Sequence, residues 1–282
     1  SFKGKLHSRT LESLIKEVNI LVKKGYKDFS FVSQDSSSYL RDLGHNDGLE
    51  QLIDAVEKID GVKTARILYL YPSTTTLNLI DKIADSKVFV NYFDMPLQHI
   101  SQNMLKIMKR GKGAEKLIEL MNYMKSKPNS FVRTTFIAGH PGESEEDFEE
   151  LCSFVEEFGF DRGNVFSYSD EEGTSAETRD DKIEQELIDE RAEILGDIIS
   201  QTTIKSLEND IGKSFEVYID GESQEHEYLL SARKTIWAPQ IDGEIYINDN
   251  EDNIPIVFGE IYEVEATELA GDKLLAKIIR KV

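Results

Sequence analysis

Short apolar runs alternate with segments of helical period along most of this sequence, and this alternation constrains the fold most strongly. Strands are expected in 28–35, 63–73, 87–101, 130–139 and 161–176. Helices are expected in 8–24, 47–61, 75–86, 102–111, 114–126, 144–159 and 179–209. The strands are continuous apolar runs, which are typical of parallel sheets with both faces covered. The pattern therefore predicts an α/β fold with a parallel sheet.

The order of these elements favours an incomplete barrel. Each of five strands is followed by a helix, and one helix precedes the first strand. A β/α series that begins with a helix indicates that a further strand belongs before it. The prediction is a partial (β/α)6 barrel that lacks its first strand, with its site at the carboxyl ends of the strands. A flat, doubly wound sheet is the alternative.

The pattern changes after residue 210. Four segments of period-two alternation are separated by Gly, Asp and Asn turns, which predicts a small all-β barrel resembling an OB fold. We therefore expect two domains, 1–210 and 211–282. The second holds seven Lys or Arg and 15 Asp or Glu, a net charge of −8. It lacks the basic groove with which such barrels grip nucleic acid.

Charge and cysteine content exclude several classes of protein. The formal net charge of −20 argues against a nucleic-acid binder and favours a basic partner or a small ligand. No apolar run is long enough to span a membrane, and no secretory signal is visible. The single cysteine, Cys152, excludes a disulfide framework and a cysteine-bound metal cluster within these residues. It is typical of a reducing, cytoplasmic compartment.

The stretch TTFIAGHPGESEEDFEEL, residues 134–151, links an expected strand to an expected helix. Ser144 and Asp147 fit a capping box, and the acids between them suit the positive end of a helix. These acids would repel a phosphate, so the turn is not a phosphate cradle. Gly139 and Gly142 leave the strand end without side chains, which would let a flat ligand approach the backbone.

Polar residues follow, end or lie within the five expected strands. They are Gln34, Asp35, Tyr71, Ser73, Gln98, His99, Arg133, Thr135, Tyr168, Ser169 and Asp170. Each has a structural alternative: Asp35 would cap the next segment, His99 would be a turn histidine, and Arg133 would pair with an acid. Together they predict a ligand site at one mouth of the barrel. Methionines at helical spacing are interpreted as core instead: Met104, Met108, Met121 and Met124.

Six segments, in order, resemble the radical-SAM methylthiotransferases. They are FKGKLHSR, VSQDSSSYLRDLG, YLYPS, DMPLQHISQNMLKIMKRG, RTTFIAGHPGESEEDFEEL and FSYSDEEGTSA. The final β module resembles the TRAM domain of that family. DMPLQH and SDEEGT fit the branch that modifies an aspartate of a small-subunit ribosomal protein better than the branch that modifies tRNA. His7 stands where this family commonly has arginine.

The resemblance implies the cofactors. The family uses S-adenosyl-L-methionine (SAM) and two 4Fe-4S clusters, and the cluster cysteines would lie outside this chain, upstream of Phe2. One-electron cleavage of SAM yields a radical that abstracts an unactivated hydrogen. Without the cluster cysteines, this fragment alone is expected to be inactive.

The resemblance also implies roles for individual residues. Gln34 and Asp35 would contact the SAM amino group, and Arg133 would pair with its carboxylate. The SAM pocket would further be lined by Tyr71, Ser73, Gln98, Thr135 and Gly139. Tyr168 would face the substrate.

The implied partner is a basic small-subunit ribosomal protein or the ribosomal subunit, which fits the acidic β module. The electron donor and the sulfur source are not identified by the sequence. Three alternatives stay open. They are a tRNA methylthiotransferase, a non-catalytic binding protein that has lost the cluster, and a barrel enzyme that uses carboxylates for acid–base catalysis.

Overall fold

The computed structural model describes residues 4–111, 113–250 and 253–282. The chain forms two compact units, Ser1–Ile199 and Ser200–Val282. The division falls inside helix α7 (Gln185–Glu208), whereas the sequence places the domain boundary after residue 210. Because α7 continues across the division, no change in amino-acid composition marks the point where one unit ends and the next begins. No helix of the described residues is both long and apolar enough to cross a membrane.

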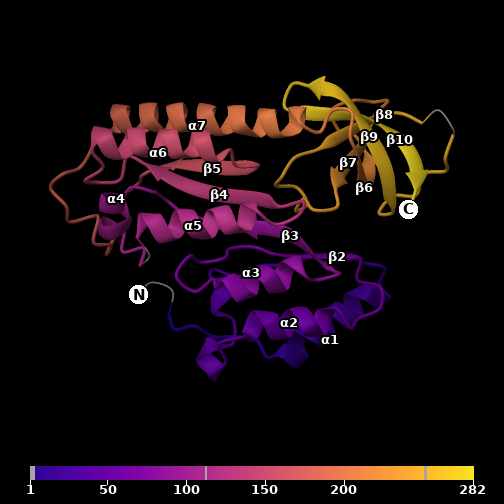
Figure 1. Ribbon diagram of the computed structural model, residues 1–282, viewed down its shortest axis with the longest axis horizontal. Coiled ribbons are helices and arrows are strands. Elements are labelled where there is room, and N and C mark those ends of the chain that lie inside the picture. Colours follow the sequence, from indigo (N-terminus) through magenta and orange to yellow (C-terminus); the bar gives the residue numbers. More distant parts are fainter. Residues whose placement is uncertain (1–3, 112, 251–252) are drawn as a thin grey trace. The chain divides into compact units, whose positions relative to one another are not determined.

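The first unit is built on a five-stranded parallel sheet (Figure 1). Its strands are β1 (Asp28–Phe31), β2 (Thr64–Ile67), β3 (Phe89–Asp94), β4 (Phe131–Ala138) and β5 (Arg162–Ser167). They lie in the order β1-β2-β3-β4-β5, so each strand pairs with the next strand along the chain. A doubly wound sheet reverses its strand order at a switch point. The consecutive order confirms the partial barrel and rejects the flat alternative.

Helices connect the strands as the sequence predicts. They are α1 (Leu11–Lys23), α2 (Gly48–Val56), α3 (Leu77–Ala84), α4 (Gln102–Ile107), α5 (Ala114–Lys125), α6 (Glu145–Phe158) and α7. Two short 3₁₀ helices, Ser36–Ser38 and Arg41–Leu43, follow β1. Side chains of Thr10, Thr76, Ser101 and Ser144 cap α1, α3, α4 and α6 by accepting a backbone N–H from the first turn.

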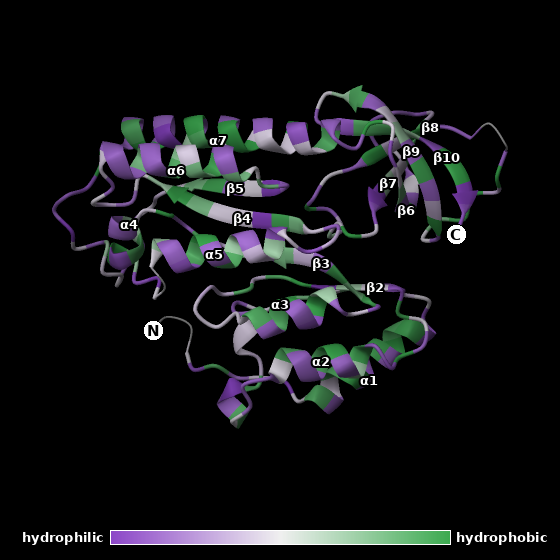
Figure 2. Ribbon diagram, in the orientation of Figure 1, coloured by the Kyte–Doolittle hydropathy of each residue, from purple (hydrophilic) through white to green (hydrophobic). Residues whose placement is uncertain are grey.

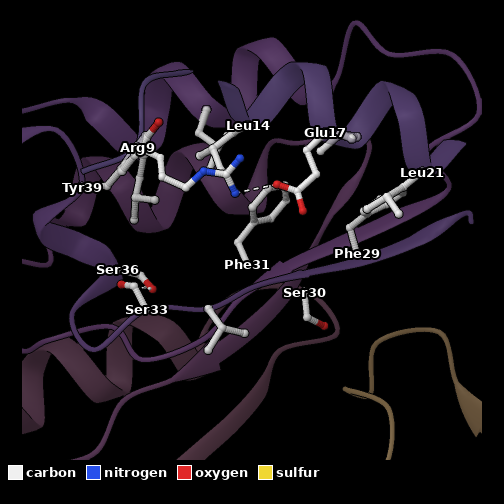
Figure 3. A pocket seen from close by; sticks show the side chains of 14 residues that line it. Arg9, Leu14, Glu17, Leu21, Phe29, Ser30, Phe31, Ser33, Ser36 and Tyr39 are labelled. Atoms are coloured by element: carbon white, nitrogen blue, oxygen red, sulfur yellow. Dashed lines mark hydrogen bonds and ion pairs between the residues drawn. The ribbon is translucent and has the colours of Figure 1, made fainter. Parts of the chain in front are cut away.

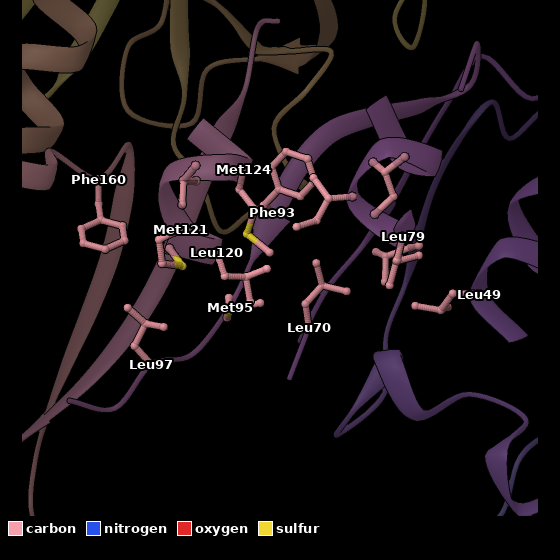
Figure 4. Close-up of a cluster of buried hydrophobic side chains, with 14 of the residues drawn as sticks. Leu49, Leu70, Leu79, Phe93, Met95, Leu97, Leu120, Met121, Met124 and Phe160 are labelled. Atoms are coloured by element: carbon pink, nitrogen blue, oxygen red, sulfur yellow. The ribbon is translucent and has the colours of Figure 1, made fainter. Parts of the chain in front are cut away.

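The core of the first unit lies between the sheet and these helices. Figure 4 shows Met95, Leu97, Met121, Met124 and Phe160 among its buried side chains. Met104 is buried as well, so the interpretation of the methionines as core is confirmed except at Met108, which lines a cavity. Green and purple stretches alternate along the helices in Figure 2, as expected for amphipathic elements with one buried face.

The second unit is a closed five-stranded barrel. Its strands are β6 (Ser214–Glu222), β7 (Leu230–Lys234), β8 (Ile245–Asp249), β9 (Ile261–Ala270) and β10 (Lys273–Lys281). They close in the order β10-β8-β7-β6-β9, with β8 and β10 parallel and the other pairs antiparallel. Tyr218, Trp237 and Tyr262 are buried in this unit. The predicted all-β barrel is thus confirmed.

Candidate functional site

A cavity of about 760 Å³ lies where the carboxyl ends of the strands meet. Its walls come from α4, β4, β5 and the segments that follow β2, β3, α4, β4 and β5. Five of the polar residues that predict the site line it: Gln98, Arg133, Thr135, Tyr168 and Ser169. This volume falls within the range of small-molecule sites. The topology therefore brings together, as predicted, polar residues from separate strand ends.

Arg133 projects into this cavity from β4 and pairs with Asp94 at the end of β3. The Arg133 Nη1–Asp94 Oδ1 distance is 3.0 Å, and Asp94 also accepts the Tyr69 backbone N–H at 3.0 Å. In the amide orientation that its hydrogen bonds require, Asn164 accepts from Arg133 Nη2 at 2.7 Å. Burial raises the pKa of Asp94, although Arg133 and the Tyr69 N–H oppose this shift.

Sequence reasoning missed Asp94 and Asn164 as partners of Arg133. Asp94 ends the apolar run FVNYFD, and Asn164 occupies an edge strand, so neither carries a motif of its own. Strand register supplies the missing signal, because Asp94 and Arg133 are paired positions of β3 and β4. Two residues that are paired on neighbouring strands can bring a carboxylate to a guanidinium, although no sequence motif connects them.

A second guanidinium, that of Arg110, lines the same cavity just beyond α4. Its Cζ lies 5.5 Å from the centre of the Tyr71 ring, a cation–π arrangement. Burial lowers the pKa of Arg110, and the Tyr71 side chain acts in the opposite direction. Tyr71 is therefore next to the cavity without lining it. Ser73 also lies outside the lining, close to the position a side chain would take at Gly111.

Gln34 and Asp35 lie apart from this cavity. The Asp35 carboxylate caps the 3₁₀ helix Ser36–Ser38, accepting Ser38 N at 3.1 Å and Ser37 Oγ at 2.8 Å. This is the capping role that the sequence offered as the structural alternative. The Gln34 side chain is exposed. Neither residue lines the cavity, so their contact with a ligand stays a prediction.

Gly139 does not line the cavity either, and the structure gives a different reason for a glycine there. Its φ is +78°, and a β-carbon would lie 2.6 Å from Ile188 Cγ1 on α7. The close approach of α7 therefore gives a structural reason for this glycine, and the approach of a flat ligand stays a prediction. At Gly142, with φ +87°, a β-carbon would meet the ends of Arg179, Asp181 and Ile107.

The Glu143 side chain accepts hydrogen bonds from within the same turn and from α7. Its two carboxylate oxygens each accept the Gly139 N–H at 3.1 Å, and Oε1 accepts Arg191 Nη1 from α7 at 2.9 Å. Arg191 Nη2 reaches Glu145 at 2.8 Å. His99 Nε2 lies 3.5 Å from Glu143 Oε2 and is buried. The turn therefore joins the end of β4, the segment after β3 and α7 in one buried polar network.

Asp147 ties the beginnings of α4 and α6 together. The predicted capping box of Ser144 and Asp147 is confirmed. Asp147 also accepts Ser101 Oγ, the cap of α4, at 2.5 Å and Asn103 Nδ2 at 2.8 Å. Burial by itself would raise the pKa of Asp147, but these hydrogen bonds and those from Ser144 outweigh it and hold the pKa below its ordinary value.

We expect Asp147→Asn to destabilise the first unit by about 1–2 kcal/mol at pH 7, the cost of weakening a cap and buried hydrogen bonds. The folded pKa lies below the unfolded value, so the ionised carboxylate stabilises the fold above the unfolded pKa, near 4. That stabilisation is lost as the pH falls through the folded pKa. Urea unfolding at pH 7 and pH 3 should therefore show a smaller difference between variant and parent at pH 3. An equal difference at both pH values would contradict this assignment.

His140 and Tyr168 are neighbours in the wall of the cavity. Their ring centres lie 5.0 Å apart in an edge-to-face arrangement, and Tyr168 Oη donates to Asp170 at 2.7 Å. Burial lowers the pKa of His140. Burial, and then the hydrogen bond with Asp170, raise the pKa of Tyr168. Each shift favours the neutral form of its ring, which suits side chains that bind and orient a ligand rather than side chains that ionise.

A smaller cavity of about 280 Å³ lies between α1 and β1, the edge strand of the sheet. Figure 3 shows Leu14, Leu21 and Phe31 around it, with the ion pair of Arg9 and Glu17 across it. Its lining is mainly apolar, which is typical of a packing surface rather than of a site for a polar cofactor.

The residues described here offer no site for a metal cluster. Across 4–111, 113–250 and 253–282, no group of three His, Cys, Asp or Glu could hold a metal ion. Cys152 is half-buried on α6, and burial together with nearby Glu143 raises its pKa to about 11. A raised pKa disfavours the thiolate, the form in which cysteine binds a metal.

Comparisons with known proteins agree with this architecture. The family model of the radical SAM superfamily matches residues 1–155, and that of the TRAM domain matches residues 211–279. The ribosomal protein uS12 methylthiotransferase RimO of Aliarcobacter butzleri is 78% identical over 282 residues, covering 99% of this chain and 63% of that protein. RimO of Sulfurovum sp. is 61% identical over 281 residues, covering 100% of this chain and 64% of that protein.

Among solved structures, the coproporphyrinogen III oxidase of Escherichia coli, described as a radical SAM enzyme, matches with a TM-score of 0.48 and 16% identity. The match covers 73% of this chain and 48% of that one. The chain spans less than two thirds of the length of the two curated relatives named above.

Proposed function

We propose, from the premise that this chain belongs to the radical SAM superfamily, that the protein it forms part of methylthiolates an aspartate side chain of ribosomal protein uS12. The observation that carries the proposal is 78% identity, over 282 residues, to a protein named a uS12 methylthiotransferase. The cavity at the strand ends supports it, because a radical reaction needs a site that fixes its reactants and excludes water.

The size and lining of the cavity support SAM as its ligand. Its volume of about 760 Å³ suits a nucleoside-sized ligand, and its walls combine apolar surface with a few polar groups. When bound, SAM supplies the radical chemistry that gives the superfamily its name. Gln98 and Thr135 would orient it at the strand ends. Tyr168 would face the substrate. The other residues predicted for the site do not line the cavity; they are Tyr71, Ser73, Gly139, Gln34 and Asp35.

Arg133 would hold the SAM carboxylate. A guanidinium carries five N–H donors in a fixed fork, so pairing with Asp94 is compatible with a second anionic partner. Asp94 and Asn164 fix the orientation of this fork before any ligand arrives. A preorganised donor loses less conformational entropy on binding than a mobile one.

The iron–sulfur clusters do not fit the residues present. Three thiolates are needed for a cluster with one open iron, and the chain has one cysteine with a raised pKa. We propose that the ligands of two 4Fe-4S clusters lie in other parts of the protein, and that this fragment alone is inactive. A strand carrying the first set would pair with β1, the edge of the sheet.

The proposal is tested by anaerobic reconstitution of the full-length protein with iron, sulfide and SAM, followed by mass analysis of uS12. A methylthio group on an aspartate is the expected product. The same assay with tRNA tests the other branch of the family. The β module has a net charge of −8, which favours a basic protein surface over RNA. Modified tRNA and unmodified uS12 would reject the proposal.

Arg133→Ala should weaken SAM binding about tenfold or more, the loss expected for one charge-assisted hydrogen bond. The measurement is the dissociation constant of SAM for the reconstituted full-length protein. Arg179→Ala, which removes a partly exposed guanidinium paired with Asp181 outside the cavity wall, is the control and should leave SAM affinity unchanged. Unchanged SAM affinity in the Arg133 variant would remove this residue from the site.

A further inference from the structure

We propose that Arg110 binds the carboxylate of the substrate and thereby selects an aspartate side chain. This inference rests on the proposed function, in which two carboxylates enter the cavity, one of SAM and one of the substrate. The cavity presents two guanidiniums, Arg110 and Arg133. The surroundings of the two guanidiniums differ in charge and in depth. These differences assign the carboxylate of SAM to Arg133 and that of the substrate to Arg110.

The first difference is in charge. Arg133 is paired with Asp94, so its charge is balanced within the protein. Over the described residues, Arg110 interacts with the Tyr71 side chain and forms no ion pair with an acid. The chain carries 53 acidic residues against 33 basic ones, so a half-buried cation without a carboxylate is unusual in it. A carboxylate from outside would supply the partner that Arg110 lacks.

The second difference is in depth. Arg133 is 8% exposed and is the third residue of β4, whereas Arg110 is half-buried in the loop that follows α4. A small molecule such as SAM can reach the inner position. The reach of a side chain on a macromolecule is limited by its own backbone. The substrate side chain would therefore meet the more exposed guanidinium, that of Arg110. Phe166, which is 59% exposed on the same cavity wall, would contact the peptide around that side chain.

Arg110 is held in place for this role. Its backbone N–H donates to Leu105 O at 2.8 Å, which ties the loop to the last turn of α4. The Tyr71 ring supports the guanidinium from one side. A fixed fork can bind both oxygens of a carboxylate, whereas the amide of asparagine offers one oxygen acceptor and no charge. Arg110 would therefore distinguish aspartate from asparagine at the target position.

A double-mutant cycle between enzyme and substrate tests this inference. Mass analysis of the wild-type product first identifies the target aspartate of uS12. The dissociation constants of uS12 and of its Asp→Asn variant are then measured by fluorescence anisotropy. These constants are measured for three reconstituted full-length enzymes: the wild type, Arg110→Gln and Lys109→Gln. Lys109→Gln is a matched control, because Lys109 is the exposed neighbour of Arg110 and does not line the cavity.

We expect Arg110→Gln and the uS12 variant each to weaken binding about tenfold or more, the range of a charge-assisted pair, with little further loss when they are combined. Lys109→Gln should stay within about twofold of the wild type, and Arg110→Gln should bind SAM normally. Independent losses in the cycle, or a loss of SAM affinity in Arg110→Gln, would overturn the inference and leave the proposed function standing. A wild-type protein that does not modify uS12 would overturn both.

Discussion

Glu143→Ala is expected to destabilise the first unit by about 3–5 kcal/mol, the range for removing one partner of a buried ion pair. The Glu143 side chain is 0% exposed and that of Arg191 is 5% exposed. Alanine would leave Arg191 Nη1 and the Gly139 N–H without the carboxylate that both contact. The loss should appear as a lower urea midpoint in far-UV circular dichroism, which follows helices α1 to α7.

Glu145→Ala is the matched control for this experiment. Glu145 pairs with the same guanidinium, at 2.8 Å from Arg191 Nη2, but its side chain is 65% exposed. Pairs with an exposed partner contribute about 0–1 kcal/mol, and Arg191 keeps its buried partner Glu143 in this variant. Similar losses in the two variants would show that the buried network around Glu143 is not what holds this turn.

The arrangement of the sheet could be predicted because it follows from local patterns. The continuous apolar runs of β3 and β4 predicted strands that are buried on both faces, and the helices between the strands predicted the elements that bury them. The capping box at Ser144 was visible for the same reason, since both partners lie within four residues. In a parallel sheet, strand ends then share one edge, so Gln98, Arg133 and Thr135 were predicted to meet and do line one cavity.

Contacts between distant parts of the chain were not predicted. The carboxylate that holds Arg133 belongs to another strand, and the helix that requires a glycine at 139 begins about 46 residues later. The sequence left two readings open for Asp35, a cap or a ligand contact, and the cap is what the structure contains. Periodicity reports which face of an element is buried and does not report which side chain it meets.

Gly139→Ala should destabilise the first unit by about 2–4 kcal/mol. One part of this cost is the left-handed backbone, with φ +78°, which costs a residue with a side chain about 1–2 kcal/mol. The other part is the clash with Ile188, whose γ-carbons would lie 2.6 and 2.8 Å from the new β-carbon. Urea unfolding measured by circular dichroism gives the total.

Two further variants separate these parts. Gly25→Ala places a side chain at φ +97° with nothing within 4 Å, so it should show the backbone cost alone. In an Ile188→Ala background the γ-carbons are absent, so the additional cost of Gly139→Ala should fall toward that of Gly25→Ala. A loss of SAM affinity in Gly139→Ala without loss of stability would instead support the original prediction, in which this glycine leaves room for a ligand. The two explanations are distinguished because packing against α7 affects the free energy of unfolding of the first unit, whereas room for a nucleoside affects only ligand binding.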